Sequence, residues 1–142
     1  RTWRYTLEKP GDGWMRPDHD DGKWREGPAG FGTRGTPGGA VRTEWATPQI
    51  WLRRSFELDG PVPAGLELLV HHDEDVVIYI NGVQAASASG VTTGYEEVPI
   101  TASGKAALKP GANGIAVQCR QSTGGQYIDV GFAAVRAQKD KF

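Results

Sequence analysis

Apolar and polar residues alternate along the chain in short stretches, which is the pattern of half-buried β-strands. The clearest stretch covers residues 50–58, where the apolar side chains share one parity: Ile50, Leu52, Phe56 and Leu58. Further strands are expected at residues 3–7, 66–72, 76–80, 83–88, 95–100, 115–120 and 127–135. About eight short strands separated by turn signals predict an antiparallel β-sandwich or barrel.

Turn chemistry divides these strands. Asn81-Gly82 lies between two apolar stretches and predicts a two-residue hairpin of type I′, because both residues tolerate a positive φ. Residues 101–108 predict a short helical turn with Ser103 as its cap. The stretch 8–39 is rich in Gly, Pro and Asp, and we expect it to be irregular and held by its aromatic residues: Trp14, Trp24 and Phe31.

Length and charge narrow the class of protein. The chain has 142 residues and suits one domain, with a core over about residues 3–136 and a tail at 137–142. A net charge of −1 provides no basic excess, so we expect no nucleic-acid partner. No apolar stretch approaches the ~20 residues of a membrane span, so no membrane partner is expected either. We expect a monomer, and we interpret a chain that begins at Arg1 as an excised domain or mature fragment.

The chain has a single cysteine, so it cannot form an internal disulfide. Cys119 follows Ile115 and Val117 on the same parity, which indicates a buried, small apolar side chain. We expect no required cofactor, with a structural calcium ion kept as an alternative.

Several motifs occur in a recognisable order: Asp-Asp-Gly-Lys-Trp at 20–24, Gly-Phe-Gly at 30–32, Ile-Trp-Leu-Arg-Arg-Ser-Phe at 50–56, His-His-Asp-Glu-Asp at 71–75, Val-Ile-Tyr-Ile-Asn-Gly at 77–82, Lys-Pro-Gly-Ala-Asn at 109–113 and Ile-Ala-Val at 115–117. This order resembles the galactose-binding-like jelly rolls attached to glycoside hydrolases, including the sugar-binding-like domain of β-galactosidase and β-glucuronidase relatives. The resemblance covers roughly residues 3–135. These motifs describe turns and strands, so they specify the fold better than the function.

The resemblance implies an all-β protein, an antiparallel β-sandwich of the jelly-roll, galactose-binding-like type. It further implies a non-catalytic carbohydrate-binding module that tethers a covalently linked catalytic domain to an oligo- or polysaccharide outside the cell or in the periplasm. The alternative is a structural or interdomain domain without a ligand of its own. Exposed, mutually reachable side chains of Trp45, His71 and Tyr127 would favour the module. Burial of all three, with a large apolar patch on the outer face, would favour the structural domain.

A sugar site needs aromatic rings for the C–H faces of a pyranose and polar side chains for its hydroxyls. Trp45 is the first candidate ring because it lies in a polar loop beside Arg42 and Glu44. The alternatives are that Trp45 closes the end of the core and that its two charged neighbours are simply solvated.

The densest polar cluster lies between two apolar strands and contains His71, His72, Asp73, Glu74 and Asp75. Four interpretations remain open: a site for sugar hydroxyls, calcium binding by the carboxylates, zinc binding by the histidine pair, and turn-capping carboxylates without a ligand. Zinc is disfavoured because adjacent strand residues point in opposite directions.

A third candidate patch combines two strands near the C-terminal end of the sequence. If these strands are neighbours, Arg120, Tyr127 and Asp129 line one surface with Gln118, and Gln126 lies in the glycine-bearing loop at its edge. An Arg–Asp pair beside a tyrosine suits a sugar subsite, and it equally suits an ordinary surface ion pair.

The sequence argues against an enzyme. Glycoside hydrolysis needs two carboxyl groups about 5–10 Å apart across a cleft, and neighbouring carboxylates such as Asp73 and Asp75 cannot span a substrate alone. No nucleophile elbow, His-Glu-x-x-His motif or phosphate-binding loop is present in the sequence.

Overall fold

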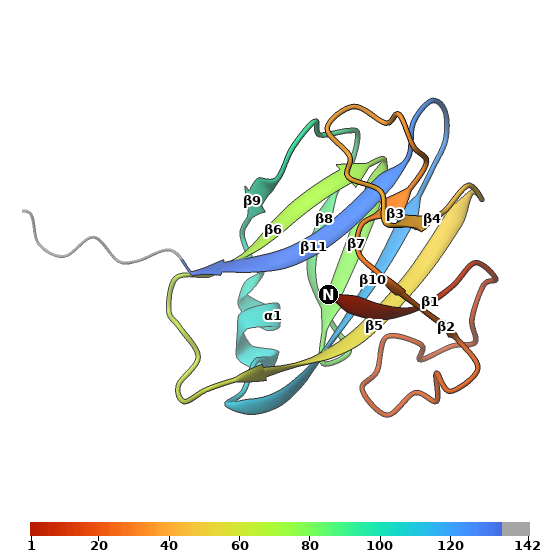
Figure 1. Cartoon of the computed structure of the whole chain (residues 1–142). Coiled ribbons are helices and arrows are strands. Elements are labelled where there is room, and N and C mark those ends of the chain that lie inside the picture. The colour runs from red at the N-terminus through yellow and green to blue at the C-terminus, as the bar shows by residue number, and fades with distance from the viewer. Residues whose placement is uncertain (135–142) are drawn as a thin grey trace, which may run out of the picture.

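The computed structural model describes residues 1–134, which form two β-sheets packed face to face (Figure 1). Sheet A has six strands in the order β2-β1-β5-β10-β7-β8, and sheet B has five in the order β4-β3-β11-β6-β9. The pairing is antiparallel except between β3 and β4. The predicted antiparallel β-sandwich is therefore confirmed.

The strands of sheet A are β1 (Thr2–Thr6), β2 (Arg25–Pro28), β5 (Gln49–Leu58), β7 (Asp75–Ile80), β8 (Val83–Ala88) and β10 (Gly111–Arg120). Those of sheet B are β3 (Phe31–Gly32), β4 (Thr43–Glu44), β6 (Leu66–Asp73), β9 (Glu96–Val98) and β11 (Tyr127–Ala134). One helix, α1 (Ala102–Ala107), connects β9 to β10. The predicted tail at 137–142 lies outside the described residues.

The core fills the space between the two sheets. The apolar parity of β5 faces inward as predicted, and it meets the inward side chains of β6, β7, β10 and β11, among them Leu68, Val70, Ile78, Val117 and Ile128. Burial of each such side chain stabilises the fold by roughly 1.5–3 kcal/mol. Cys119 is also buried there, as its parity predicts, and burial raises the pKa of its thiol.

The predicted hairpin joins β7 to β8. Asn81 has φ of 49° and Gly82 has φ of 85°, the pair of positive values that a type I′ turn requires. The Asn81 side chain also accepts a hydrogen bond from the Gly114 amide (2.7 Å) and donates to Asn113 Oδ1 (2.9 Å). The turn is therefore tied to the beginning of β10.

Helix α1 lies close against β8, but its cap differs from the sequence prediction. Thr101, not Ser103, is the N-cap residue, and its Oγ1 accepts from the Gly104 amide at 3.0 Å. Gly104 allows the close approach, because a Cβ at that position would lie 2.7 Å from the Cβ of Ala85.

The long glycine-rich stretch is only partly irregular, since it contains β2 and β3. Its first part, residues 8–24, is here called the strap, and it covers part of the outer face of sheet A, the face turned away from sheet B. Trp14 of the strap packs with Trp51 and Ala116 of the sheet, and its ring meets Tyr79 edge-on at 5.6 Å.

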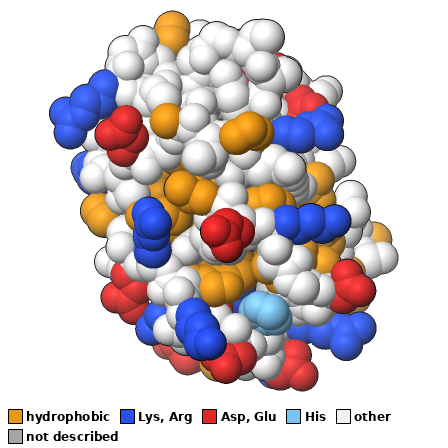
Figure 2. All heavy atoms as spheres, turned by 90° about the vertical axis from the view of Figure 1, so that its right-hand side faces the viewer, with side chains coloured by type: hydrophobic (Ala, Val, Ile, Leu, Met, Phe, Trp, Pro, Cys, Tyr) orange, Lys and Arg blue, Asp and Glu red, His pale blue; other side chains and the backbone are white. Residues whose placement is uncertain are grey.

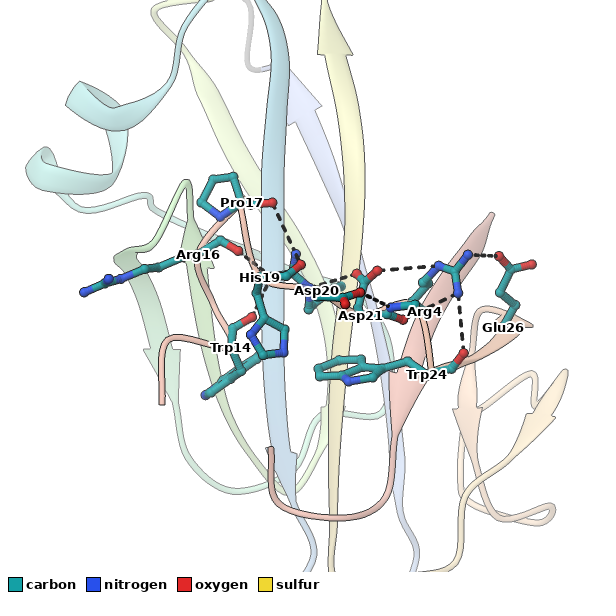
Figure 3. A network of polar contacts seen from close by, with 11 residues as sticks. Arg4, Trp14, Arg16, Pro17, His19, Asp20, Asp21, Trp24 and Glu26 are labelled. Carbon is teal, nitrogen blue, oxygen red and sulfur yellow. Dashed lines mark hydrogen bonds and ion pairs between the residues drawn. The ribbon is translucent and has the colours of Figure 1, made fainter. Parts of the chain in front are cut away.

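One arginine of β5 holds the strap in place, and Figure 3 labels its partners in the strap: Trp14, Arg16, Pro17, His19 and Asp21. Arg53 Nη1 donates to the carbonyl oxygens of Trp14 (2.5 Å) and Arg16 (2.7 Å), and its Nε donates to the Asp21 carboxylate (2.9 Å). Nη2 reaches two further carbonyls, and the residue is only 8% exposed. The strap is therefore held by its aromatic residues and also by a buried cation, Arg53, which the sequence did not predict.

Candidate functional site

The predicted site residues lie in four different places. Sheet B carries four of them on its outer face: His71, Asp73, Tyr127 and Asp129. Sheet A carries Asp75 and Arg120 on its outer face. The loops and short strand at one end of the sandwich carry Arg42, Glu44, Trp45 and Gln126, while His72 lies on the inward parity of β6.

Trp45 does not offer a stacking surface, so this candidate is wrong. Its side chain is 0% exposed and belongs to the core, as the alternative interpretation stated. The Trp45 amide donates to the Gly32 carbonyl at 2.9 Å, which fixes the backbone where the indole closes the end of the sandwich. Arg42 and Glu44 are exposed beside it, but the buried indole cannot form a sugar-binding surface together with them.

The predicted joint patch of Gln118, Arg120, Tyr127 and Asp129 is also wrong. Strand β10 belongs to sheet A and β11 to sheet B, so their outer faces look in opposite directions. The two strands follow each other in the sequence, but β10 pairs with β5 and β7, and β11 pairs with β3 and β6.

On sheet A, Arg120 pairs with a different carboxylate. Its Nη2 lies 3.5 Å from Asp75 Oδ2, and Asp75 Oδ1 accepts from the Gly90 amide at 3.0 Å. These side chains border a shallow hollow of about 420 Å³ with Val77 and Gln118. The ion-pair interpretation therefore describes Arg120, with Asp75 as its partner.

A larger hollow of about 490 Å³ lies beside the strap, lined by Met15, Pro17, Ser55 and Lys109 among others. Two of the guanidinium groups that line it are already engaged, because Arg53 and Arg4 both form ion pairs with Asp21. The side of the molecule at the right of Figure 1 carries hydrophobic side chains between charged groups of both signs (Figure 2).

On sheet B, strand pairing gathers the polar cluster around one histidine. His71 is opposite Asp129, and Asp73 is opposite Tyr127. The His71 ring packs against Tyr127, with ring centres 4.5 Å apart, and against Tyr95 at 5.6 Å. His71 and Tyr127 are each only 1% exposed, so both rings support the surface from below.

Tyr95 is the exposed ring of this cluster. Its sequence context predicted a strand at residues 95–100 and did not indicate a site. It is 51% exposed, and its hydroxyl donates to the Asp129 carboxylate. Strand β9 begins one residue later, at Glu96, so Tyr95 ends the loop after β8. The combination of His71, Tyr95, Tyr127 and Asp129 is here called the Tyr95 platform.

The protonation states of the platform follow from burial and from Asp129. Both raise the pKa of Tyr95 and of Tyr127, so the phenols stay protonated at neutral pH. Burial lowers the pKa of His71. The platform therefore combines a neutral imidazole, a phenol donor and one carboxylate acceptor.

Two buried polar atoms of the cluster lack a hydrogen-bond partner among the described residues: His71 Nε2 and Asp73 Oδ1. The same holds for the indole nitrogen of Trp45. Within residues 1–134, no group of three or more His, Cys, Asp or Glu side chains is arranged to hold a metal ion. Calcium binding stays a prediction.

The turn beside the cluster uses its carboxylates structurally. Glu74 Oε1 accepts from the Thr123 amide at 2.9 Å, which ties the turn between β6 and β7 to the loop between β10 and β11. Gln126 in that loop donates to the Thr47 carbonyl at 3.0 Å and is buried.

Within residues 1–134, no helix is long and apolar enough to cross a membrane.

Comparison with known proteins identifies the fold. No protein-family model matches the sequence, and neither does any curated protein. Among solved structures, a glycosyl hydrolase family 2 member from Bacteroides cellulosilyticus DSM 14838 is 18% identical, with a TM-score of 0.61 over 91% of this chain and 20% of that chain. A β-glucuronidase from glycoside hydrolase family 2 is 19% identical, with a TM-score of 0.58 over 87% of this chain and 13% of that chain.

A β-glycosidase from Bacteroides vulgatus matches similarly, with 16% identity and a TM-score of 0.55 over 92% of this chain and 19% of that chain. This chain therefore spans a fifth or less of each of these proteins. Its fold is that of a β-sandwich found within family 2 glycoside hydrolases. The resemblance drawn from the sequence is confirmed at the level of the fold.

Proposed function

We propose that this chain is a non-catalytic accessory domain of a larger, exported glycoside hydrolase and that it binds carbohydrate through the Tyr95 platform. The observation that carries the accessory role is the pattern of coverage. About nine tenths of this chain superimpose on the first family 2 member, but they account for only 20% of it. A domain that makes up so small a part leaves the rest of the protein to supply the catalytic site.

The platform supports carbohydrate binding because its exposed ring is already fixed. The hydrogen bond from Tyr95 to Asp129 and the packing on His71 hold the ring, so little conformational entropy is lost when a ligand stacks on it. Asp129 accepts hydrogen bonds, as sugar hydroxyls require. On an open surface we expect weak binding, with a Kd between micromolar and millimolar, or about −4 to −8 kcal/mol.

Hydrolysis assays test the accessory role directly. The 142-residue chain and the full-length protein that contains it are compared on a panel of nitrophenyl glycosides. We expect turnover by the full-length protein and none by the chain. Turnover by the chain alone would overturn the proposal, and so would a full-length protein inactive on every glycoside.

A structural domain without a ligand is the second candidate, and the burial of three predicted contact residues favours it. Trp45, His71 and Tyr127 are all inside the protein, which leaves Tyr95 to present the ring. A glycan array separates the two candidates. Retention of at least one glycan by the chain, weakened by Tyr95→Ala, supports binding. If no glycan is retained and deletion of the domain lowers the thermal stability of the full-length enzyme, the structural role is correct.

A further inference from the structure

An open strip continues from the Tyr95 platform along the outer face of sheet B. Gly131 pairs with Leu69 of β6, which pairs in turn with Glu97 of β9. A Cβ at Gly131 would meet no atom of residues 1–134 within 4 Å, so this row is a place where a ligand can approach the backbone. The next row along the same face pairs Ala133 with Glu67.

These rows lie on the same parity as Asp129, because side chains two residues apart point to the same face of a strand. From Asp129 to Ala133 the strand advances by four residues, or about 13 Å. That length exceeds one pyranose ring, so an oligosaccharide stacked on Tyr95 extends over Gly131 toward the second row. Leu69, which is half-buried, supplies an apolar contact at the centre of the strip.

The charges of this strip have one sign. Among residues 1–134, the charged side chains that these pairings place in its rows are carboxylates: Glu67 and Glu97, with Asp129 of the platform at one end. Carboxylates accept hydrogen bonds from neutral hydroxyls, whereas a carboxylate or sulfate on the ligand would meet like charges at close range. Repulsion across a partly exposed surface lowers affinity for the charged ligand without affecting a neutral one.

We infer that the strip formed by Glu67, Leu69, Glu97 and Gly131 is a binding surface for a neutral saccharide chain and discriminates against chains that carry uronate or sulfate groups. This inference rests on the proposed carbohydrate-binding function. It assigns that function a ligand class and a direction along β11.

A substitution at Gly131 tests the position of the strip. Gly131→Leu places an apolar side chain in the row, where its Cβ meets no described atom within 4 Å. Gly11→Leu in the strap is the matched control, because the same holds for a Cβ at Gly11. Binding is measured by affinity electrophoresis of the 142-residue chain in gels containing galactomannan, xyloglucan or arabinan, and in gels containing polygalacturonate. We expect at least one neutral polymer to retard the wild-type chain. The affinity for that polymer should fall about tenfold in Gly131→Leu and stay unchanged in Gly11→Leu, while the thermal stability of both variants equals that of the wild type.

The charge preference has a separate test. The wild-type chain should be retarded less by polygalacturonate than by the neutral polymer. In the double variant Glu67→Gln/Glu97→Gln, the ratio of the two affinities should be about tenfold smaller. Equal retardation by both kinds of polymer, or normal binding by Gly131→Leu, would overturn the inference and leave the binding function standing. If no polymer and no glycan-array sugar binds the wild-type chain, the binding function itself fails.

Discussion

Arg53 shows how one side chain can organise a segment that has little regular structure of its own. Its guanidinium donates to four carbonyl oxygens and one carboxylate of the strap, so the strap gains partners for backbone oxygens that would otherwise be buried without them. Periodicity placed Arg53 on the outer parity of β5. It could not show that a loop 32 to 39 residues earlier in the sequence folds back to surround the guanidinium.

Arg53→Met should therefore destabilise the domain by about 2–4 kcal/mol, because several buried carbonyl groups and Asp21 lose a charged donor at once. The free energy of unfolding is measured by urea denaturation. Arg25→Met, at an exposed position of β2, is the control and should change it by no more than about 0.5 kcal/mol. Equal effects of the two substitutions would show that Arg53 does not hold the strap.

Tyr95 is the residue whose substitution separates binding from folding. Its ring is half outside the protein, so Tyr95→Ala should weaken glycan binding about tenfold or more while the melting temperature stays nearly constant. Tyr95→Phe keeps the ring and removes the donor to Asp129, and an intermediate loss is expected. Isothermal titration calorimetry measures both, and undiminished binding by Tyr95→Ala would exclude the platform as the site.

His71 links the platform to pH. Burial lowers its pKa from 6.5, so the unfolded chain takes up a proton at a higher pH than the folded chain does. The contribution of His71 to stability is complete above pH 6.5 and is lost as the pH falls through the folded-state pKa. Asp73 opposes this at lower pH, because burial and Glu74 raise its pKa above 3.8 and the folded chain then binds the proton more readily.

His71→Gln should consequently flatten the decline in the free energy of unfolding between pH 7 and pH 5, whatever its effect on absolute stability. Urea denaturation of both proteins at several pH values provides the slopes. Identical slopes would mean that His71 does not titrate differently in the folded and unfolded chains.

At the scale of the element, local patterns predicted most of what the structure contains. The parity of β5 and the Asn81-Gly82 hairpin are correct because both depend on neighbouring residues alone. The cap of α1 was misplaced by two residues, since Thr101 and Ser103 are both good caps and only the position where the helix begins distinguishes them.

The two hydroxyl residues offer a direct comparison. Thr101→Ala should destabilise the domain by about 1 kcal/mol, because the Gly104 amide loses its acceptor and Thr101 also donates to the Gln84 carbonyl. Ser103→Ala, on the exposed surface of α1, should change the free energy of unfolding by less than about 0.5 kcal/mol. A larger loss of unfolding free energy in Ser103→Ala than in Thr101→Ala would show that Ser103 is the N-cap residue.

At the scale of the whole molecule, the sequence predicted the sandwich but not the assignment of strands to sheets. That assignment separates Arg120 from Asp129, buries Trp45 and gathers His71 and Tyr127 beneath Tyr95. These relations join residues that are distant in the sequence, and strand periodicity carries no information about which strand is a neighbour. The candidate site therefore needed the structure, whereas the fold class did not.

The proposed binding function depends most on carbohydrate contacting the outer face of sheet B. Backbone amide NMR spectra of the chain, titrated with a neutral oligosaccharide retained on the glycan array, locate that contact residue by residue. We predict that the largest saturable shifts fall on Leu69, Tyr95, Asp129 and Gly131, with those of Asp75 and Arg120 unchanged. Saturable shifts confined to the Asp75–Arg120 surface of sheet A would contradict carbohydrate binding on sheet B.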